Sequence, residues 1–175
     1  MKIVVLGLAA LAVATAAQAE VVAVKDNGFE VRQTAEVKAP AAKVYEALVK
    51  VGGWWDPSHS WSGDAANISI DPKVGGCWCE TLPNGGGVRH MEVTGVAPGK
   101  SLHFTGGLGP LRFTGASGHM NWSLAEKDGI TTVTWTYAVG GFAKDGFATW
   151  APAVDGVLGA ALKRLKTYAE TGKPT

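Results

Sequence analysis

The stretch Phe147-Ala-Thr-Trp-Ala-Pro-Ala-Val-Asp-Gly-Val-Leu-Gly-Ala-Ala-Leu-Lys-Arg-Leu-Lys-Thr-Tyr168, near the end of the chain, decides the fold class. Its apolar residues recur at three- and four-residue spacing, whereas Asp155, Lys163 and Lys166 take the opposite side. Thr149 is placed to cap the helix that this pattern predicts. We therefore expect a long amphipathic helix whose apolar face packs against the rest of the molecule.

Two glycines interrupt the pattern of this helix. Gly156 and Gly159 each cost about 1 kcal/mol relative to alanine inside a helix. We expect a strand or a ligand to approach the helix closely at these positions.

The middle of the chain alternates between apolar and polar residues, which is typical of half-buried strands. The expected strands cover 29–37, 66–70, 77–82, 88–96, 102–108, 116–124 and 133–139. One short helix is expected between Pro40 and Gly52. The pattern predicts an α+β domain, with a curved antiparallel sheet of about six to seven strands wrapped around the C-terminal helix.

The first 19 residues have the three-part plan of a secretory signal peptide. Lys2 supplies the positive charge, residues 3–17 form an apolar run, and Ala17-Gln18-Ala19 is a small-residue cleavage site. The apolar run is shorter than the roughly 20 residues that cross a membrane. We expect cleavage after Ala19, a single domain over residues 20–175, and a periplasmic or secreted protein without integral membrane association.

Composition excludes several classes of function. The chain has 16 Lys and Arg against 15 Asp and Glu, so it lacks the basic surface of a nucleic-acid-binding protein. Its 24 glycines and 7 tryptophans favour a sheet-rich fold with a cavity or a sugar-binding face. No cofactor is expected, because the phosphate-loop-like segment 95–101 has Thr94 where the motif requires its first glycine. The oligomeric state stays open.

Aromatic side chains are the clearest candidate ligand contacts. Trp54, Trp55 and Trp61 lie in one turn-rich loop, and His59 lies beside them. These side chains either plug the domain or gate a ligand entrance. A second set would face inward from two paired strands and the long helix, as either plain core or pocket lining: Met120, Trp122, Trp135, Tyr137, Trp150 and Val154.

The turn between those two strands sets their register. The segment Glu126-Lys-Asp-Gly129 predicts a hairpin, and its turn at Asp128-Gly129 is expected to place Trp122 near Val133. The same turn would place Met120 near Trp135.

Cys77, Cys79 and Glu80 share one short strand. Residues two apart on a strand are about 6.6 Å from each other, which resists a disulfide, so buried thiols are favoured over a bridge formed through a bulge at Gly75-Gly76. Glu80 is exposed if both cysteines face inward; the sequence does not decide the register, although an exposed carboxylate is favoured. In the opposite register Glu80 enters an apolar cavity, where burial would raise its pKa and make it a candidate acid or base.

Three histidines are expected on the polar outer face of the sheet. By strand parity these are His90, His103 and His119, of which His90 lies too far along the sheet to join the other two. We therefore predict no metal site.

Four short sequence segments, in this order along the chain, resemble sequences of the SRPBCC superfamily and of its polyketide cyclase/dehydrase-like branch. They are Val37-Lys-Ala-Pro-Ala-Ala-Lys-Val-Tyr45, Trp54-Trp-Asp-Pro57, Ile70-Asp-Pro-Lys-Val-Gly-Gly76 and Val154-Asp-Gly-Val-Leu158. The resemblance covers the chain from about Phe29 onward. It implies a START-like helix-grip fold with a hydrophobic cavity between the sheet and the C-terminal helix, and no catalytic residue common to the superfamily.

Three functions are compatible with these patterns. The first is an exported protein that binds a small hydrophobic or aromatic molecule in that cavity. The second is a cyclase- or dehydratase-like enzyme that uses Glu80, His59 or Asp155 as its acid or base. The third is a carbohydrate-binding module that uses exposed tryptophan.

Overall fold

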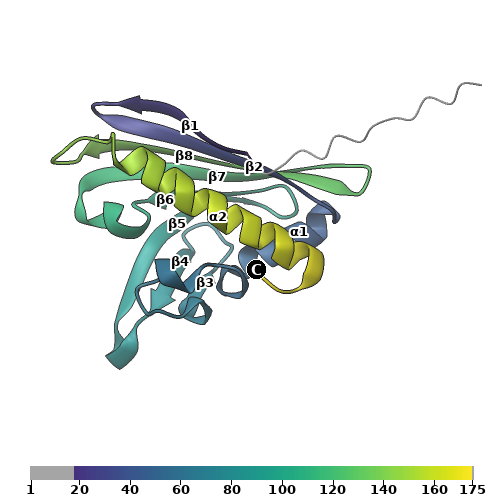
Figure 1. Cartoon of the computed structure of the whole chain (residues 1–175). Coiled ribbons are helices and arrows are strands. Elements are labelled where there is room, and N and C mark those ends of the chain that lie inside the picture. The colour runs from purple at the N-terminus through teal and green to yellow at the C-terminus, as the bar shows by residue number, and fades with distance from the viewer. Residues whose placement is uncertain (1–17, 175) are drawn as a thin grey trace, which may run out of the picture.

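The computed structural model of the protein describes residues 18–174, and Figure 1 shows a sheet with one long helix across a face. The strands of the described part are β1 (Gln18–Lys25), β2 (Gly28–Val37), β3 (Ile68–Ile70), β4 (Cys77–Thr81), β5 (Gly87–Ala97), β6 (Ser101–Gly106), β7 (Gly115–Lys127) and β8 (Ile130–Phe142). The helices are α1 (Ala41–Val49) and α2 (Trp150–Thr171). Short 3-10 segments are η1 (Val51–Gly53), η2 (Pro57–His59), η3 (Ala65–Asn67), η4 (Pro83–Gly85) and η5 (Gly109–Phe113).

All eight strands form one antiparallel sheet in the order β1-β2-β8-β7-β6-β5-β4-β3. The strands from β3 to β8 follow one another as a meander, and β2 then pairs with β8. The segment with α1 and η1 to η3 connects β2 to β3 at the other end of the sheet. This arrangement confirms the predicted α+β helix-grip fold. Among the described residues, neither helix is long and apolar enough to cross a membrane.

The edge strand β1 is the strand that sequence patterning missed. All eight of its side chains are exposed, so it carries no alternation that could reveal it. The predicted leader lies largely outside the described residues, but its last two residues, Gln18 and Ala19, begin β1. A Cβ atom at Gly159 of α2 would lie 3.2 Å from Cβ of Ala19, so the predicted close approach is confirmed there. At Gly156 no strand approaches, because no protein atom lies within 4 Å of the Cβ position.

The β7–β8 hairpin turns at Asp128-Gly129, as predicted, but its strands pair in a different register from the predicted one. Only Asp128 and Gly129 form the loop, with φ angles of 53° and 75°, as a two-residue hairpin turn requires. The strands therefore continue to Lys127 and Ile130, and Trp122 pairs with Trp135. The predicted pairs of Trp122 with Val133 and of Met120 with Trp135 are wrong by two residues, because Met120 pairs with Tyr137.

The start of α2 also differs from the expectation. Thr149 occupies the N-cap position, but its side chain makes no capping hydrogen bond. Its backbone is already helical, at φ −86° and ψ −26°. The N–H groups of Trp150 and Ala151 donate instead to the carbonyl of Phe147, each at 3.1 Å. The predicted cap is therefore wrong, and the backbone of the preceding turn replaces it.

A cluster of large aromatic rings fills the space between the middle of the sheet and α2. Trp122 stacks on Trp135 with ring centroids 4.7 Å apart and planes at 20°. Trp54 lies 5.7 Å from Trp135 and 6.1 Å from Trp122. Trp78 continues the cluster toward β4, 5.2 Å from Trp122. All four side chains are almost fully buried, so this part of the interior is a packed core.

Candidate functional site

A cavity of about 350 Å³ lies where this aromatic core ends, beside the first half of α2. Its walls come from α2, from the loop that contains η2, from η5 and from β5. The lining residues are Trp55, Ser58, His59, Ser60, Trp61, His90, Leu108, Gly109, Pro110, Trp150, Ala153, Val154, Val157 and Leu158. Most of these side chains are apolar, so the cavity suits an apolar ligand.

The loop at one wall is folded back on itself. The indole N–H of Trp55 donates to the carbonyl of His59 at 3.1 Å, and Trp55 packs edge-on against Trp78 with centroids 5.4 Å apart. Asp56 caps η2 by accepting hydrogen bonds from the backbone and hydroxyl of Ser58, at 2.9 and 2.7 Å. These bonds hold the pKa of Asp56 below its usual range. Hydrogen bonds therefore fix the backbone of this loop at both ends of the short η2 segment.

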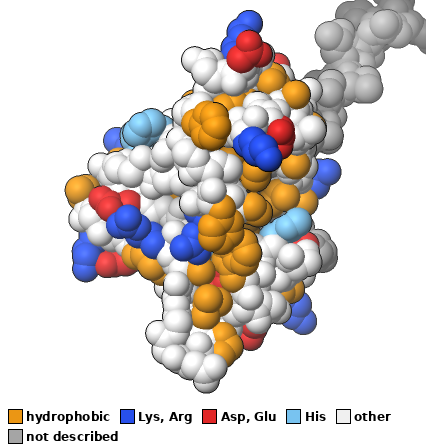
Figure 2. Space-filling model, turned by 90° about the vertical axis from the view of Figure 1, so that its left-hand side faces the viewer, with side chains coloured by type: hydrophobic (Ala, Val, Ile, Leu, Met, Phe, Trp, Pro, Cys, Tyr) orange, Lys and Arg blue, Asp and Glu red, His pale blue; other side chains and the backbone are white. Residues whose placement is uncertain are grey.

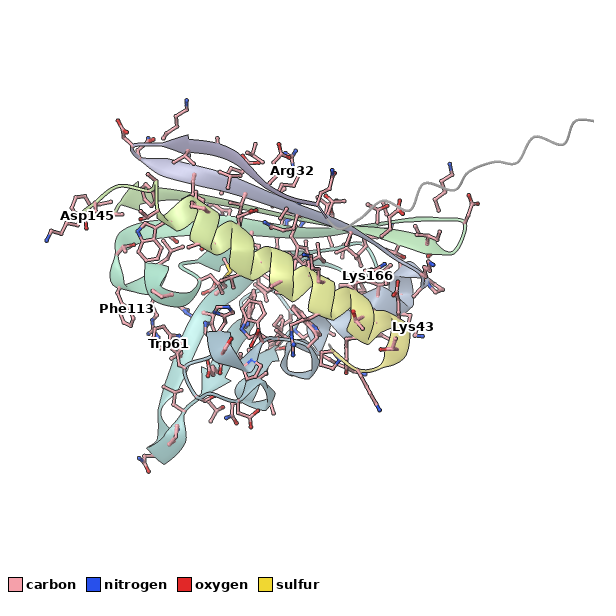
Figure 3. All side chains as sticks on the ribbon, viewed as in Figure 1. Arg32, Lys43, Trp61, Phe113, Asp145 and Lys166 are labelled. Carbon is pink, nitrogen blue, oxygen red and sulfur yellow. A yellow bond between two sulfur atoms is a disulfide. The ribbon has the colours of Figure 1, made fainter. Side chains whose placement is uncertain are left out.

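Two exposed aromatic rings lie beside this cavity. Trp61 and Phe113 point toward each other in Figure 3, in an edge-to-face contact with ring centroids 5.6 Å apart. Trp61 is 42% exposed and Phe113 is 71% exposed. The guanidinium of Arg112 lies 5.2 Å from the centroid of Phe113. Figure 2, which views that side of the molecule, shows a band of apolar side chains down the face.

The wall formed by η5 is held by a buried tyrosine. The hydroxyl of Tyr137 donates to the carbonyl of Gly106 at 2.9 Å and accepts from the N–H of Leu108 at 3.0 Å. Burial raises the pKa of Tyr137 to about 12. Tyr137 therefore does not line the cavity but fixes the start of the segment that does.

A buried Glu80–His90 pair is the main polar feature of the site. The carboxylate of Glu80 accepts hydrogen bonds from the backbone N–H groups of Trp61 and Ser62, at 3.1 and 2.5 Å, and from Nε2 of His90 at 3.0 Å. The side chain of His90 is 4% exposed and that of Glu80 is 0% exposed. Glu80 therefore ties the Trp61 loop to β4, while His90 forms part of the cavity wall.

Both members of this pair correct sequence-based predictions. Glu80 was expected to be exposed and His90 to lie on the outer face of the sheet. Between β4 and β5 the register shifts, so that Trp78 pairs with Met91 while Cys79 pairs with Arg89. The extra residue in β5 is His90, and this β-bulge lets both His90 and Met91 face the interior.

The protonation of the pair follows from its surroundings. Burial alone would raise the pKa of Glu80, but the hydrogen bonds from Ser62, Trp61 and His90 outweigh it and hold that pKa below its usual value. Burial lowers the pKa of His90 despite its hydrogen bond to Glu80. At neutral pH the pair is therefore an ionised carboxylate and a neutral imidazole.

Cys77 and Cys79 form a disulfide, so the expectation of free thiols is wrong. Their Cα atoms are 5.3 Å apart, closer than the roughly 6.6 Å of an extended strand. The irregularity in the ladder lies between Trp78 and Cys79 rather than at Gly75-Gly76. Both cysteines are half-buried, whereas Trp78 and Glu80 are buried, so the register that places Glu80 in the interior is present.

The structure brings together some of the predicted site residues and separates the others. Trp55, His59, Trp61, Trp150 and Val154 line the cavity. Trp54, Met120, Trp122, Trp135 and Tyr137 lie in the packed core and outside the cavity lining. Asp155 also lies outside the lining, and its carboxylate accepts a hydrogen bond from Gln33 Nε2 of β2 at 2.6 Å.

His103 and His119 are exposed on the outer face, as predicted. Within residues 18–174, no three His, Cys, Asp or Glu side chains are grouped so that they could hold a metal ion.

Several lining residues were missed by the reasoning from sequence. Ala153, Val157 and Leu158 follow Trp150 at helical spacing, so the apolar stripe of α2 contains the signal that could have found them. Leu108 and Pro110 lie in a segment without periodicity, and nothing in the sequence pattern marks them.

Comparison with solved structures shows the same fold at low sequence identity. A conserved protein of unknown function from Enterococcus faecalis matches with a TM-score of 0.60 and 18% identity, over 87% of this chain and 77% of that one. CalU16 from Micromonospora echinospora matches with a TM-score of 0.59 and 13% identity, over 92% and 88%. The Aha1 dimer from Colwellia psychrerythraea matches with a TM-score of 0.57 and 21% identity, over 82% and 98%.

Comparison of the sequence alone gives the family. A search of curated proteins found no match. Residues 28–170 match the family described as polyketide cyclase/dehydrase and lipid transport. This segment runs from the start of β2 almost to the end of α2. The chain therefore belongs to the polyketide cyclase/dehydrase and lipid transport family, with the helix-grip fold that its sequence predicts.

Proposed function

We propose that this protein binds a small hydrophobic or aromatic molecule in the cavity beside the first half of α2. The observation that carries the proposal is the apolar lining of that cavity, to which the helix contributes Trp150, Val154, Val157 and Leu158. Its volume of about 350 Å³ lies at the lower end of the roughly 300–1,000 Å³ of ligand pockets. A molecule of one or two rings suits this space better than a long-chain lipid.

The exposed pair of Trp61 and Phe113 supports a route of entry. Trp61 lines the cavity and also contacts solvent. An apolar ligand that passes between the two rings would leave water before it reaches the interior, which favours its capture. We propose that these rings form the gate of the pocket.

A displacement assay with a matched pair of variants tests binding. The probe is 1-anilinonaphthalene-8-sulfonate, whose fluorescence rises in an apolar site, and naphthalene is the competitor. Val157→Trp places an indole in the cavity and should weaken binding of both compounds at least tenfold. Ala160→Trp adds the same side chain at an exposed position of the same helix, outside the cavity lining, and should leave binding unchanged. Equal binding by the two variants would refute a site at this cavity.

An enzyme is the second candidate, and the Glu80–His90 pair is the observation that favours it. A cyclase- or dehydratase-like reaction needs a proton acceptor at the cavity wall, and His90 offers a neutral imidazole there. His59 also lines the cavity but is exposed, and Asp155 lies outside the lining. A substrate turned over by the wild type and not by His90→Phe would support the enzyme.

The carbohydrate-binding alternative has weaker support. Of the seven tryptophans, only Trp61 is exposed. The plane of its ring lies at 82° to the ring plane of Phe113. The two rings therefore do not form a flat surface on which a sugar ring could stack.

We also propose that the protein is exported to the periplasm or secreted, because residues 1–19 have the pattern of a signal peptide. A disulfide between Cys77 and Cys79 suits an oxidising compartment. The N-terminal sequence of the protein isolated from its host tests this proposal. It should begin at Glu20, and a chain that begins at Met1 would contradict cleavage.

A further inference from the structure

Of the two edges of the described sheet, the one formed by β1 is the longer. β1 and β3 end the strand order, so each pairs with one neighbour only. β3 covers three residues, whereas β1 covers eight, and all eight side chains of β1 are exposed. In Figure 1 β1 forms the upper border of the sheet. A free edge of this length offers a row of unpaired N–H and C=O groups to another strand.

The centre of β1 lacks the residues that usually protect an edge, which are charged residues and proline. Residues 21–24 are Val-Val-Ala-Val, and the three valines are 37–38% exposed. Charged residues lie only at the two ends of this segment, Glu20 before it and Lys25 after it. Within residues 18–174 neither of them forms an ion pair, because Arg32, which lies opposite Glu20 in β2, pairs with Glu30.

A β-bulge in β1 changes which of its residues share a face. Val21 lies opposite Val31 of β2, which is buried. The extra residue of the bulge is Val22, and after it Val24 lies opposite Phe29, which is also buried. Val21 and Val24 therefore point to the same face of the sheet, the one that holds the core, although they are three residues apart and not two.

One antiparallel pairing of β1 with a second copy of itself keeps these faces together. It places Val21 of each copy opposite Val24 of the other, so that residues of the core-side face meet. The same register places Glu20 of each copy opposite Lys25 of the other, because both pairs share one midpoint in the strand. Opposite charges across a strand pair are stabilising. The segment is therefore complementary to itself, in its apolar residues and in its charges.

The side of α2 next to β1 leaves room for a second copy. A Cβ atom at Gly159 would lie 3.2 Å from Cβ of Ala19, so this side of the helix faces β1. Gly156 lies one turn earlier, is exposed and has no other element within 4 Å of its Cβ position. A glycine inside a helix destabilises it, and no contact in the described part of a single copy explains this one. A residue without a side chain keeps the space beside the free edge open.

We infer that the protein forms a two-fold symmetric dimer in which the free edges of two β1 strands pair antiparallel, with Val21 opposite Val24 and Glu20 opposite Lys25. The two sheets then continue as one, in the manner of an added strand. Each copy uses its own β1 edge in the contact, so the assembly closes at two copies. Residues 20–25 all remain after the proposed cleavage, and none of them lines the cavity. The dimer is therefore independent of the proposed ligand.

Sedimentation velocity of the mature protein, over micromolar to millimolar concentrations, tests the dimer and its register. The wild type should shift from one to two chain masses as its concentration rises. Glu20→Lys and Lys25→Glu each set like charges opposite one another at two symmetric contacts, and each should weaken association at least tenfold. An equimolar mixture of these two variants restores opposite charges at both contacts, so it should associate at least tenfold more tightly than either variant alone.

Matched control variants make the same charge changes outside the edge. Glu46→Lys and Lys43→Glu lie at exposed positions of α1, and Figure 3 labels Lys43. Both should associate as the wild type does, and their mixture should gain nothing. An isotope-filtered NOE spectrum of mixed ¹³C-labelled and unlabelled wild type tests the register without a variant. It should show contacts between the methyl groups of Val21 in one copy and Val24 in the other.

Each of the other outcomes would overturn the inference. A wild type that stays at one chain mass at every concentration has no such dimer. A dimer that neither edge variant weakens has its interface elsewhere on the molecule. Edge variants that associate no better when mixed would show that Glu20 does not lie opposite Lys25. Assemblies that grow beyond two copies would contradict a pairing that uses the same edge of both chains.

Discussion

Removal of the hydroxyl of Tyr137 should destabilise the protein and loosen the pocket wall. This hydroxyl joins the end of β6 to the segment before η5, through the carbonyl of Gly106 and the N–H of Leu108. Tyr137→Phe keeps the ring in the core and deletes only the oxygen. Both backbone groups then lose a partner in a place where the N–H of Leu108 has little access to water.

The cost can be estimated from the two groups left unpaired. An orphaned buried donor or acceptor costs about 1–3 kcal/mol, and the Gly106 carbonyl lies in a less buried setting than the Leu108 N–H. We expect Tyr137→Phe to lower the free energy of unfolding by about 2–4 kcal/mol. Tyr45 of α1 provides the matched control, because its buried hydroxyl has no hydrogen-bond partner among the described residues. Tyr45→Phe should change stability by less than about 0.5 kcal/mol, or increase it slightly.

Urea unfolding followed by tryptophan fluorescence measures both variants. The midpoint should fall for Tyr137→Phe and stay in place for Tyr45→Phe, with the same slope in both cases. Because Leu108 and Pro110 line the cavity, Tyr137→Phe should also weaken probe binding in the folded protein. If the two variants proved equally stable, the Tyr137 bridge would not hold η5 and the reasoning would be refuted.

Three further predictions concern the core, the disulfide and acid stability. The indole of Trp54 donates a buried hydrogen bond to α1 whereas that of Trp135 has no partner among the described residues. Trp54→Phe should therefore cost about 1 kcal/mol more than Trp135→Phe in urea unfolding. The ring closed by Cys77 and Cys79 is so short that its reduction should lower the free energy of unfolding by only about 1–2 kcal/mol, measured with and without dithiothreitol. His90 has a lowered pKa in the folded state, so the unfolded chain takes up its proton first as the pH falls below the ordinary 6.5. Stability should thus decline below pH 6.5 in the wild type, and less steeply in His90→Phe.

Regular alternation made most of the sheet predictable from sequence. β2 and β8 each have one mostly apolar buried face, on which Gln33 and Thr131 are the polar exceptions, and both strands include the segments that the pattern predicts. The stripe of α2 likewise predicted its length and its packed face. The turn at Asp128-Gly129 was predicted, but the register was not, because a two-residue loop pairs Lys127 with Ile130 and so places Trp122 opposite Trp135 instead of Val133.

The polar part of the site was unpredictable for a different reason. Strand parity assumes that every residue has a partner across the ladder, and one extra residue reverses the faces from that point on. The bulge at His90 does this in β5, and it brings His90 to the interior beside Glu80. In a regular ladder His90 would face solvent as His103 and His119 do. A buried acid–base pair in this sheet therefore depends on an irregularity that no local sequence signal marks.

The position of the cavity follows from how the core is filled. The stacked rings of Trp122 and Trp135, with Trp54 beside them, occupy the space under the middle of α2, where a helix-grip fold could otherwise hold a ligand. The cavity lies toward the start of the helix, where Trp150 and residues of the η5 segment line it. The bulge places His90 in the wall of this cavity. A short cavity with a mostly apolar lining fits the proposed ligand, a small apolar or aromatic molecule, better than it fits a long-chain lipid.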